Sequence, residues 1–70
     1  MTEKLSVGDR EINLTQVLKL AGLAETGGQA KSFIAEGLVR VNGEVETRKR
    51  RQMAIGDTVQ VEDGPPIILS

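Results

Sequence analysis

Residues 14–45 read LTQVLKLAGLAETGGQAKSFIAEGLVRVNGEV, and the spacing of the apolar side chains changes within this stretch. Up to Gly37 the apolar residues recur at helical spacing, whereas Val39 and Val41 alternate with a polar residue, as in a half-buried strand. Asn42-Gly43 then forms a dipeptide that is typical of a tight hairpin turn. The stretch therefore predicts two consecutive helices followed by a β-hairpin.

Capping signals divide the helical part into two separate helices. Two pairs of residues have the spacing of a capping box, namely Asn13 with Gln16 and Thr26 with Gln29. The first helix should stop at Gly22, with Leu23 placed to pack back on Leu18 in a Schellman motif. Gly37 supplies the corresponding stop for the second helix. We therefore expect two short helices joined by a tight connection.

The register of the hairpin is less well determined by the residues themselves. A two-residue loop at Asn42-Gly43 would place Arg40 opposite Val45 and would put the apolar residues on opposite faces of the hairpin. A bulge or a longer loop would instead set Val41 opposite Val45. We expect the second arrangement because it gathers the valines on one face.

Strand signals continue after the hairpin and recur near both ends of the sequence. Gly56-Asp57 is a second turn signal, and it precedes a half-buried strand from Thr58 to Val61. Apolar segments around Leu5 and from Ile67 to Leu69 would add edge strands. We predict a single α+β domain over residues 1–70, with two short consecutive helices packed on a small antiparallel sheet.

The composition argues against several classes of function. The 70 residues include no cysteine and no histidine, which removes disulfides, the usual zinc ligands and the usual acid–base catalysts near neutral pH. We therefore expect no enzyme activity, no catalytic residues, no metal site and no cofactor. The sequence also lacks a secretory signal and any apolar run near the roughly 20 residues of a membrane span. We expect a cytoplasmic protein that has no membrane partner.

Charge is unevenly distributed along the chain, although the net charge is only -1. Residues 29–51 carry six basic and three acidic side chains, a net +3, and the remaining residues carry three basic and seven acidic side chains, a net -4. Arg48-Lys49-Arg50-Arg51 is the densest part of the basic segment. Four adjacent cations should repel one another, and phosphates would relieve that repulsion. The alternative is a solvated loop whose cations pair with Glu44 and Glu46.

Other candidate phosphate ligands lie near the second helix. Residues 27–29 supply its first backbone N–H groups, which can bind phosphate unless the capping box already uses them. Lys31 projects from the polar face of this helix, and Arg40 projects outward between two valines, where either could also be an ordinary solvated cation. The predicted basic face comprises Gly27, Gly28, Gln29, Lys31, Arg40, Arg48, Lys49, Arg50 and Arg51.

The same stretch resembles a known domain family. Its motifs are Gly22-Leu23-Ala24, Thr26-Gly27-Gly28-Gln29-Ala30-Lys31, Val39-Arg40-Val41-Asn42-Gly43 and Gly56-Asp57, in the order and spacing of the S-four-type domain with its αL motif. The match covers about residues 13–62 and looks most like the small stand-alone bacterial proteins of the YbcJ type. The resemblance implies a ribosome-associated module that binds structured RNA, either ribosomal RNA or tRNA. Gly27 departs from the pattern, because the family usually has arginine there.

Two other functions remain open besides RNA binding. The acidic residues Glu62 and Asp63 suit a protein–protein adaptor on a ribosome or an RNA-processing complex. Some features also resemble a β-grasp sulfur carrier, but such carriers need a C-terminal Gly-Gly, and this sequence reads Ile68-Leu69-Ser70. Phe33 is the single aromatic residue, which argues against stacking of unpaired bases. We expect a monomer with structured RNA as its partner and with protein partners as the second option.

Overall fold

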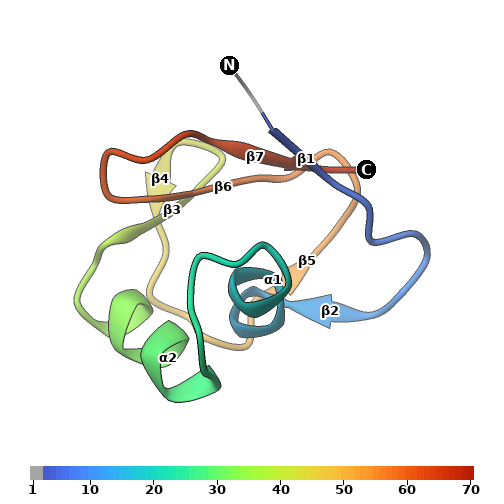
Figure 1. Cartoon of the computed structure of the whole chain (residues 1–70). Coiled ribbons are helices and arrows are strands. Elements are labelled where there is room, and N and C mark those ends of the chain that lie inside the picture. Colours follow the sequence, from blue (N-terminus) through green and yellow to red (C-terminus); the bar gives the residue numbers. More distant parts are fainter. Residues whose placement is uncertain (1–2) are drawn as a thin grey trace.

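The computed structural model describes residues 3–70, in which two helices pack against one face of a five-stranded sheet (Figure 1). The elements are β1 (Glu3–Leu5), β2 (Ile12–Asn13), α1 (Leu14–Leu20), α2 (Gly27–Ala35), β3 (Val39–Val41), β4 (Glu44–Val45), β5 (Gln52–Met53), β6 (Thr58–Val61) and β7 (Ile67–Leu69). The strand order of the sheet is β1-β7-β6-β3-β4, and β2 pairs separately with β5. The predicted α+β class is confirmed, with residues 1–2 of the predicted domain outside the described residues.

Helix α1 begins and ends at the predicted residues. The Asn13 side chain accepts a hydrogen bond from the Gln16 N–H, and the Gln16 side chain accepts one from the Asn13 N–H, both at 2.9 Å. After the last turn, Gly22 has a φ of 75°, and the Leu23 N–H donates to the Leu18 carbonyl at 3.0 Å. The capping box and the Schellman motif are therefore both confirmed.

Helix α2 has the predicted ends but only half of the predicted capping box. The Thr26 hydroxyl accepts the Gln29 N–H at 3.0 Å. The Gln29 side chain accepts the N–H of Glu25 at 2.6 Å, one residue before the expected donor. At the C-terminal end Gly37 has a φ of 75°, and the Leu38 N–H donates back into the helix. The second helix therefore also ends in a Schellman motif.

The hairpin between β3 and β4 corrects the expected register. Asn42-Gly43 forms a two-residue loop with φ values of 53° and 86°, so Arg40 faces Val45 and Val41 faces Glu44. The expected pairing of Val41 with Val45 is wrong. The tight turn matches the twist of the strands, and β4 lies at the edge of the sheet, where Val45 stays 55% exposed. Leaving this one valine exposed at the edge of the sheet is less unfavourable than inserting an extra residue into the loop.

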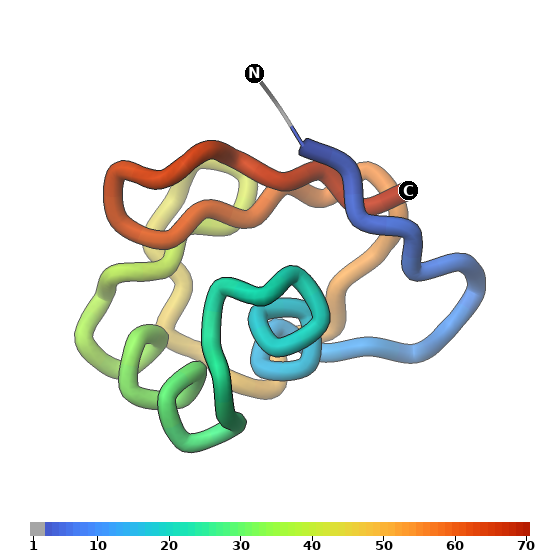
Figure 2. Tube along the Cα trace, in the orientation of Figure 1, coloured from blue at the N-terminus to red at the C-terminus, as the bar shows by residue number. Residues whose placement is uncertain are grey.

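The two terminal segments form neighbouring parallel strands. Glu3 pairs with Ile67 and Leu5 pairs with Leu69, and Figure 2 shows the blue start of the trace beside its red end. The expected edge position is right for β1 and wrong for β7, which lies between β1 and β6. Strand β7 thus has a paired strand at each edge, and its alternating side chains Ile67 and Leu69 lie on the buried face of the sheet and contribute to the core.

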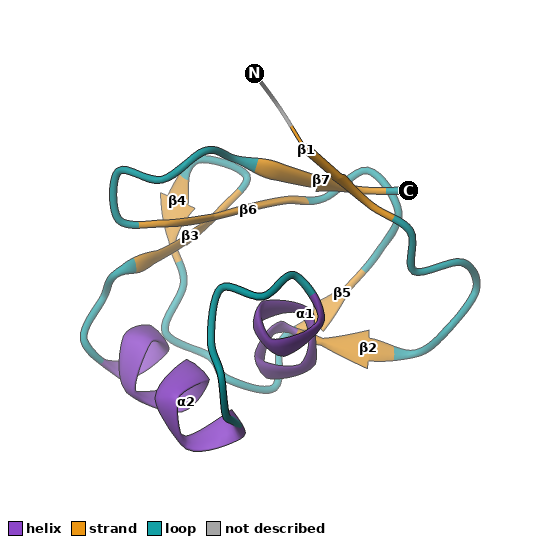
Figure 3. Ribbon diagram, viewed as in Figure 1, coloured by secondary structure: helices purple, strands orange, loops and turns teal. Residues whose placement is uncertain are grey.

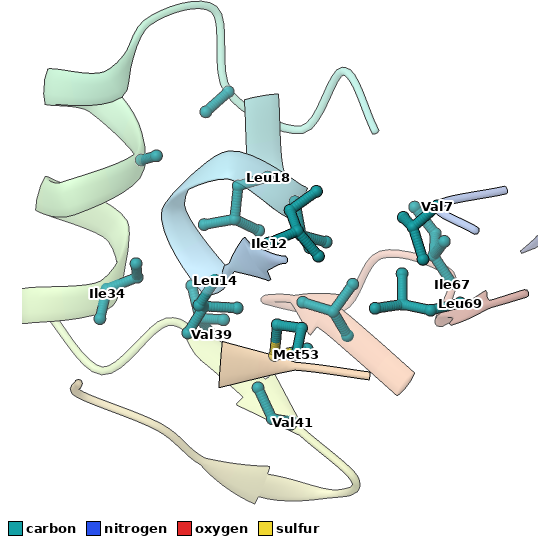
Figure 4. Packing of buried hydrophobic residues seen from close by; sticks show 14 residues of the cluster. Val7, Ile12, Leu14, Leu18, Ile34, Val39, Val41, Met53, Ile67 and Leu69 are labelled. Atoms are coloured by element: carbon teal, nitrogen blue, oxygen red, sulfur yellow. The ribbon is translucent and has the colours of Figure 1, made fainter. Parts of the chain in front are cut away.

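The core lies between the two helices and the inner face of the sheet (Figure 4). Met53 belongs to this core because β5 pairs with β2. The polar run that comes before Met53 did not indicate this strand. The largest fully buried side chains are Leu14, Leu18, Ile34, Leu69, Val17, Val39 and Val59. No helix within residues 3–70 has the length and apolar character needed to cross a membrane.

Candidate nucleic-acid interface

Residues Arg48–Arg51, called the basic turn from here on, are attached to the first turn of α1. The Arg51 N–H donates to the Arg48 carbonyl at 3.1 Å, which closes a tight turn with Lys49 and Arg50 at its centre. The Lys49 carbonyl accepts the N–H and the hydroxyl of Thr15, at 3.3 and 2.8 Å. Figure 3 shows the loop between β4 and β5 returning to the start of α1. The basic turn therefore has a fixed backbone.

The same contacts occupy the backbone donors at the start of α1. The Leu14 N–H donates to the Arg51 carbonyl at 2.9 Å, the Thr15 N–H to Lys49, and the Gln16 N–H to Asn13. A phosphate would have to displace one of these acceptors to bind the backbone here. The start of α1 therefore positions the basic turn. Only its side chains, and not its backbone N–H groups, are available to a ligand.

Glu46 holds two of the four cations of the basic turn. Arg48 places Nη2 2.9 Å from Oε1 and Nε 3.0 Å from Oε2, and Arg51 places Nε 3.0 Å from Oε1. The side-chain hydrogen bond from Arg48 lowers the pKa of Glu46 to about 2, against the opposing effect of burial and with help from the charge of Arg51. The Glu46 side chain is only 14% exposed. Glu46 is therefore a charged anchor at the base of the turn.

Arg51 also reaches a second carboxylate. Its Nη1 lies 3.3 Å from Asp57 Oδ2, and Asp57 accepts further hydrogen bonds from the Ala54 N–H at 2.9 Å and from Asn42 Nδ2 at 3.1 Å. Burial of Asp57 opposes its ionisation, but these hydrogen bonds together lower its pKa. The Asn42 side chain in turn accepts the Thr58 N–H at 2.9 Å. Arg51 therefore links the basic turn to the hairpin turn.

These contacts correct part of the expected charge balance. Four mutually repelling cations were expected, but Arg48 and Arg51 pair with carboxylates. The alternative of pairing with Glu44 and Glu46 holds for Glu46 only, because Glu44 forms no ion pair within residues 3–70 and Asp57 is the second carboxylate. Lys49 and Arg50 are exposed and make no ion pair within the described part of the chain. The uncompensated charge of the basic turn is therefore concentrated at its two central residues.

The other predicted site residues occupy two further places. Lys31 is exposed at the middle of α2. At the start of this helix the Gly27 and Gly28 N–H groups find no acceptor among the hydrogen bonds of residues 3–70. The Gln29 N–H is used by the cap. Arg40 lies between two buried valines and so on the sheet face turned away from the helices. Arg40 therefore lies apart from the helix side, which carries Lys31, so the predicted single basic face does not include Arg40. RNA binding by the predicted residues stays a prediction.

Comparison with known proteins identifies the fold family. A model of the S4 domain matches residues 5–68. The chain belongs to the S4 domain family. The resemblance inferred from the motifs is confirmed.

This S4 domain is similar to two named relatives and to one solved structure. "Putative RNA-binding protein YbcJ" of Escherichia coli strain K12 is 54% identical over 48 residues, which is 69% of each chain. "Probable ribosome maturation protein RlbA" of Bacillus subtilis strain 168 is 40% identical over 62 residues, 89% of this chain and 87% of the relative. The solution structure of E. coli YbcJ is described as revealing an ALFAL motif involved in RNA-binding. It matches this chain with a TM-score of 0.64 and 43% identity, and the match covers 97% of this chain and 84% of the YbcJ chain.

Lys19 is a basic residue of this S4 domain that the sequence did not single out. A Cβ placed on Gly27 would lie 3.9 Å from Lys19 Cδ, so the Lys19 side chain runs beside the start of α2. Lys19 is in the last turn of α1, just before the Schellman motif that ends the helix. This position in the sequence could have indicated that Lys19 lies close to the start of the next helix. Lys19 adds a positive charge near the backbone donors of Gly27 and Gly28.

A groove of about 400 Å³ runs along α1 of the S4 domain, lined by Arg10, Glu11, Ile12, Gln16, Lys19 and Leu20. It is open to solvent and contains both signs of charge. Within residues 3–70 no group of three metal-binding side chains comes together. The basic turn and the start of α2 are therefore kept as the candidate ligand-binding regions.

Proposed function

We propose that this S4 domain is a binding module for folded RNA, with ribosomal RNA or tRNA as the ligand, and that it performs no chemistry of its own. The observation that carries the proposal is the basic turn, whose backbone is fixed to α1 while Lys49 and Arg50 project without ion pairs. A pre-organised cationic turn binds phosphates with a small loss of conformational entropy. Release of counterions from the RNA supplies the favourable term.

The start of α2 extends this surface. Its Gly27 and Gly28 N–H groups have no acceptor among the bonds of residues 3–70, and Lys31 and the nearby Lys19 add positive charge. Backbone donors at a helix start bind phosphate well because the helix dipole is positive there. We therefore assign the basic turn and the start of α2 to phosphates of one RNA.

Folded RNA suits this surface better than unpaired bases. Phe33 is half-buried against the core, and the sequence has no tryptophan or tyrosine. Base stacking on aromatic rings, which single-strand binders use, has no platform here. Recognition would use phosphates, 2′-hydroxyl groups and the shape of the RNA. The names of the relatives, one RNA-binding and one in ribosome maturation, make ribosomal RNA the first ligand to test.

A titration of the protein with a folded ribosomal RNA fragment, repeated over a series of potassium chloride concentrations, tests the proposal. The affinity should fall with salt at about 0.7 in log–log slope per phosphate contact. A DNA duplex of the same sequence should bind more weakly because it lacks 2′-hydroxyl groups and A-form geometry. Equal and weak binding of both nucleic acids would reject the proposal and leave the adaptor function in its place.

A matched pair of variants locates the surface. Lys49→Gln should weaken RNA binding, whereas Lys4→Gln, at an exposed cation of β1, should bind like the unmodified protein. Both substitutions remove one exposed positive charge, so the change in net charge is the same. Equal losses in the two variants would indicate nonspecific attraction to the whole protein.

A further inference from the structure

We infer that the cations of the basic turn have divided roles: Lys49 and Arg50 contact RNA phosphates, while Arg51 is a positioning residue that holds the turn in shape. The inference rests on the proposed RNA binding, because it assigns work to residues of the same site. It differs from the sequence prediction, which treated Arg48–Arg51 as four equivalent contacts.

The contacts of Arg51 use two of its three guanidinium nitrogens. Nε donates to Glu46, and Nη1 lies within 3.3 Å of both the Gln52 carbonyl and Asp57 Oδ2. Its side chain is 25% exposed, and both carboxylates are largely covered. If Arg51 turned to a phosphate, it would leave two poorly solvated carboxylates with fewer partners, which is unfavourable. Arg51 therefore stays in place when the RNA binds.

Position in the turn gives Lys49 and Arg50 the opposite character. They are the central residues of a turn closed by the 3.1 Å hydrogen bond from the Arg51 N–H to the Arg48 carbonyl. Both are exposed. The backbone beneath them is fixed because Thr15 binds the Lys49 carbonyl twice. Their charged ends can reach a phosphate without breaking a contact of the folded protein.

Arg48 is intermediate between these two groups. It is paired with Glu46, but its side chain is 75% exposed, in contrast to the covered side chain of Arg51. If Arg48 moved to a phosphate, Arg51 would remain on Glu46. Of the two paired arginines, Arg48 can therefore move to a phosphate with the smaller loss of free energy. Arg48 is kept unchanged in the variants compared here.

The experiment compares Lys49→Gln/Arg50→Gln with Arg51→Gln and Arg51→Lys, using a folded ribosomal RNA fragment as the probe. The double variant should reduce the magnitude of the salt slope by about 1.4, for two phosphate contacts at about 0.7 each. Both Arg51 variants should keep the slope and lose about 2-fold to 10-fold in affinity, because a less ordered turn must be ordered on binding. Lysine retains the charge but lacks the two-sided guanidinium that reaches both carboxylates.

Hydrogen exchange of the Leu14 and Thr15 amides supplies a readout that does not involve RNA. Both amides donate to carbonyls of the basic turn, so they should exchange faster in the Arg51 variants and at an unchanged rate in Lys49→Gln/Arg50→Gln. If Arg51→Gln does not fold, Arg51→Lys carries the comparison. Unchanged exchange in the Arg51 variants would overturn the positioning role.

Three outcomes are separable. A reduced salt slope in Arg51→Gln that Arg51→Lys restores would make Arg51 a direct contact and would overturn the inference. An unchanged slope in Lys49→Gln/Arg50→Gln would overturn the other half. If the unmodified protein binds no RNA, the proposed function fails, and the amide exchange alone still decides whether Arg51 positions the turn.

Discussion

The Lys49 carbonyl oxygen accepts both hydrogen bonds that Thr15 can donate, from its backbone N–H at 3.3 Å and from its hydroxyl at 2.8 Å. The two residues lie 34 positions apart in the sequence. Through this contact the first turn of α1 determines where the basic turn lies. A helix that is otherwise part of the core scaffold thereby fixes the position of the turn that we propose as the RNA contact.

Thr15→Val should lower the free energy of unfolding by about 1 kcal/mol, since it removes one hydrogen bond and keeps the shape of the side chain. Urea denaturation measures this difference. Thr47→Val is the matched control, because Thr47 is exposed and its hydroxyl forms no side-chain hydrogen bond within residues 3–70, so its change should stay within about 0.5 kcal/mol. Equal effects of the two substitutions would show that the contact with Lys49 does not contribute to stability.

Acid should weaken the fold through Glu46. Its pKa is lowered from 4.5 to about 2 in the folded protein, chiefly by the side-chain hydrogen bond from Arg48, so the folded state binds its proton later than the unfolded state does as the pH falls. Stability from Glu46 is therefore fully present above the unfolded pKa and is lost from about pH 5 down to about pH 2. Urea denaturation across this range should show the loss.

Glu46→Gln should flatten the pH dependence over the same interval. Asp57, whose pKa is also lowered, should leave a residual dependence in Glu46→Gln. An identical pH profile for the unmodified protein and Glu46→Gln would contradict the assignment.

Replacing all of Arg48, Lys49, Arg50 and Arg51 by glutamine should abolish RNA binding and should also destabilise the fold. Repulsion among the four cations, taken alone, would predict an intact or slightly stabilised fold for this variant. Glu46 would instead lose both of its arginine partners while remaining mostly covered, which is unfavourable. Lys49→Gln/Arg50→Gln is the control and should keep its stability within about 0.5 kcal/mol. Thermal unfolding and RNA titration of both variants measure the two effects separately.

Asn42 should contribute to stability in two separable ways. It adopts a φ of 53°, and its side chain binds Thr58 and Asp57. Asn42→Gly keeps the left-handed backbone and should lose about 1 to 2 kcal/mol with the side-chain hydrogen bonds. Asn42→Ala should lose about 1 kcal/mol more, because alanine is strained at positive φ. Equal destabilisation by glycine and alanine, measured by urea denaturation, would show that the backbone conformation carries no cost.

Local signals predicted the helices well because the relevant contacts are local. Asn13 and Gln16 bond to each other within one turn, and Gly22 ends the helix through its own backbone conformation. The hairpin register depended instead on whether another strand would pair with the outer edge of β4. No residue of the hairpin indicates that β4 is an edge strand. Val45 was therefore assigned to the inner face, although its place at the edge leaves it exposed.

The candidate site shows the same division. The density of cations in the basic turn was visible in the sequence and directed attention to the correct loop. Their compensation was not visible from charge density alone, although both carboxylates are close in sequence: Glu46 precedes the basic turn, and Asp57 lies six positions after Arg51, in the turn between β5 and β6. Which of these carboxylates would contact the arginines depends on the fold. The attachment to Thr15 spans still more of the chain. These tertiary contacts decide which of the four cations remain available, and composition cannot rank them.

The parallel pairing of β1 with β7 has a consequence for the order of events during synthesis. Among the described strands β1 is synthesised first and β7 last, so the hydrogen bonds between them form only after the helices and strands between them have been made. Contacts between residues so far apart in sequence slow folding because a large loop must close before they form. The helices and the β3–β6 pair can assemble earlier, and the arrival of Ile67 and Leu69 then completes the core. A nascent chain of this protein should therefore stay sensitive to proteolysis until its final strand is released.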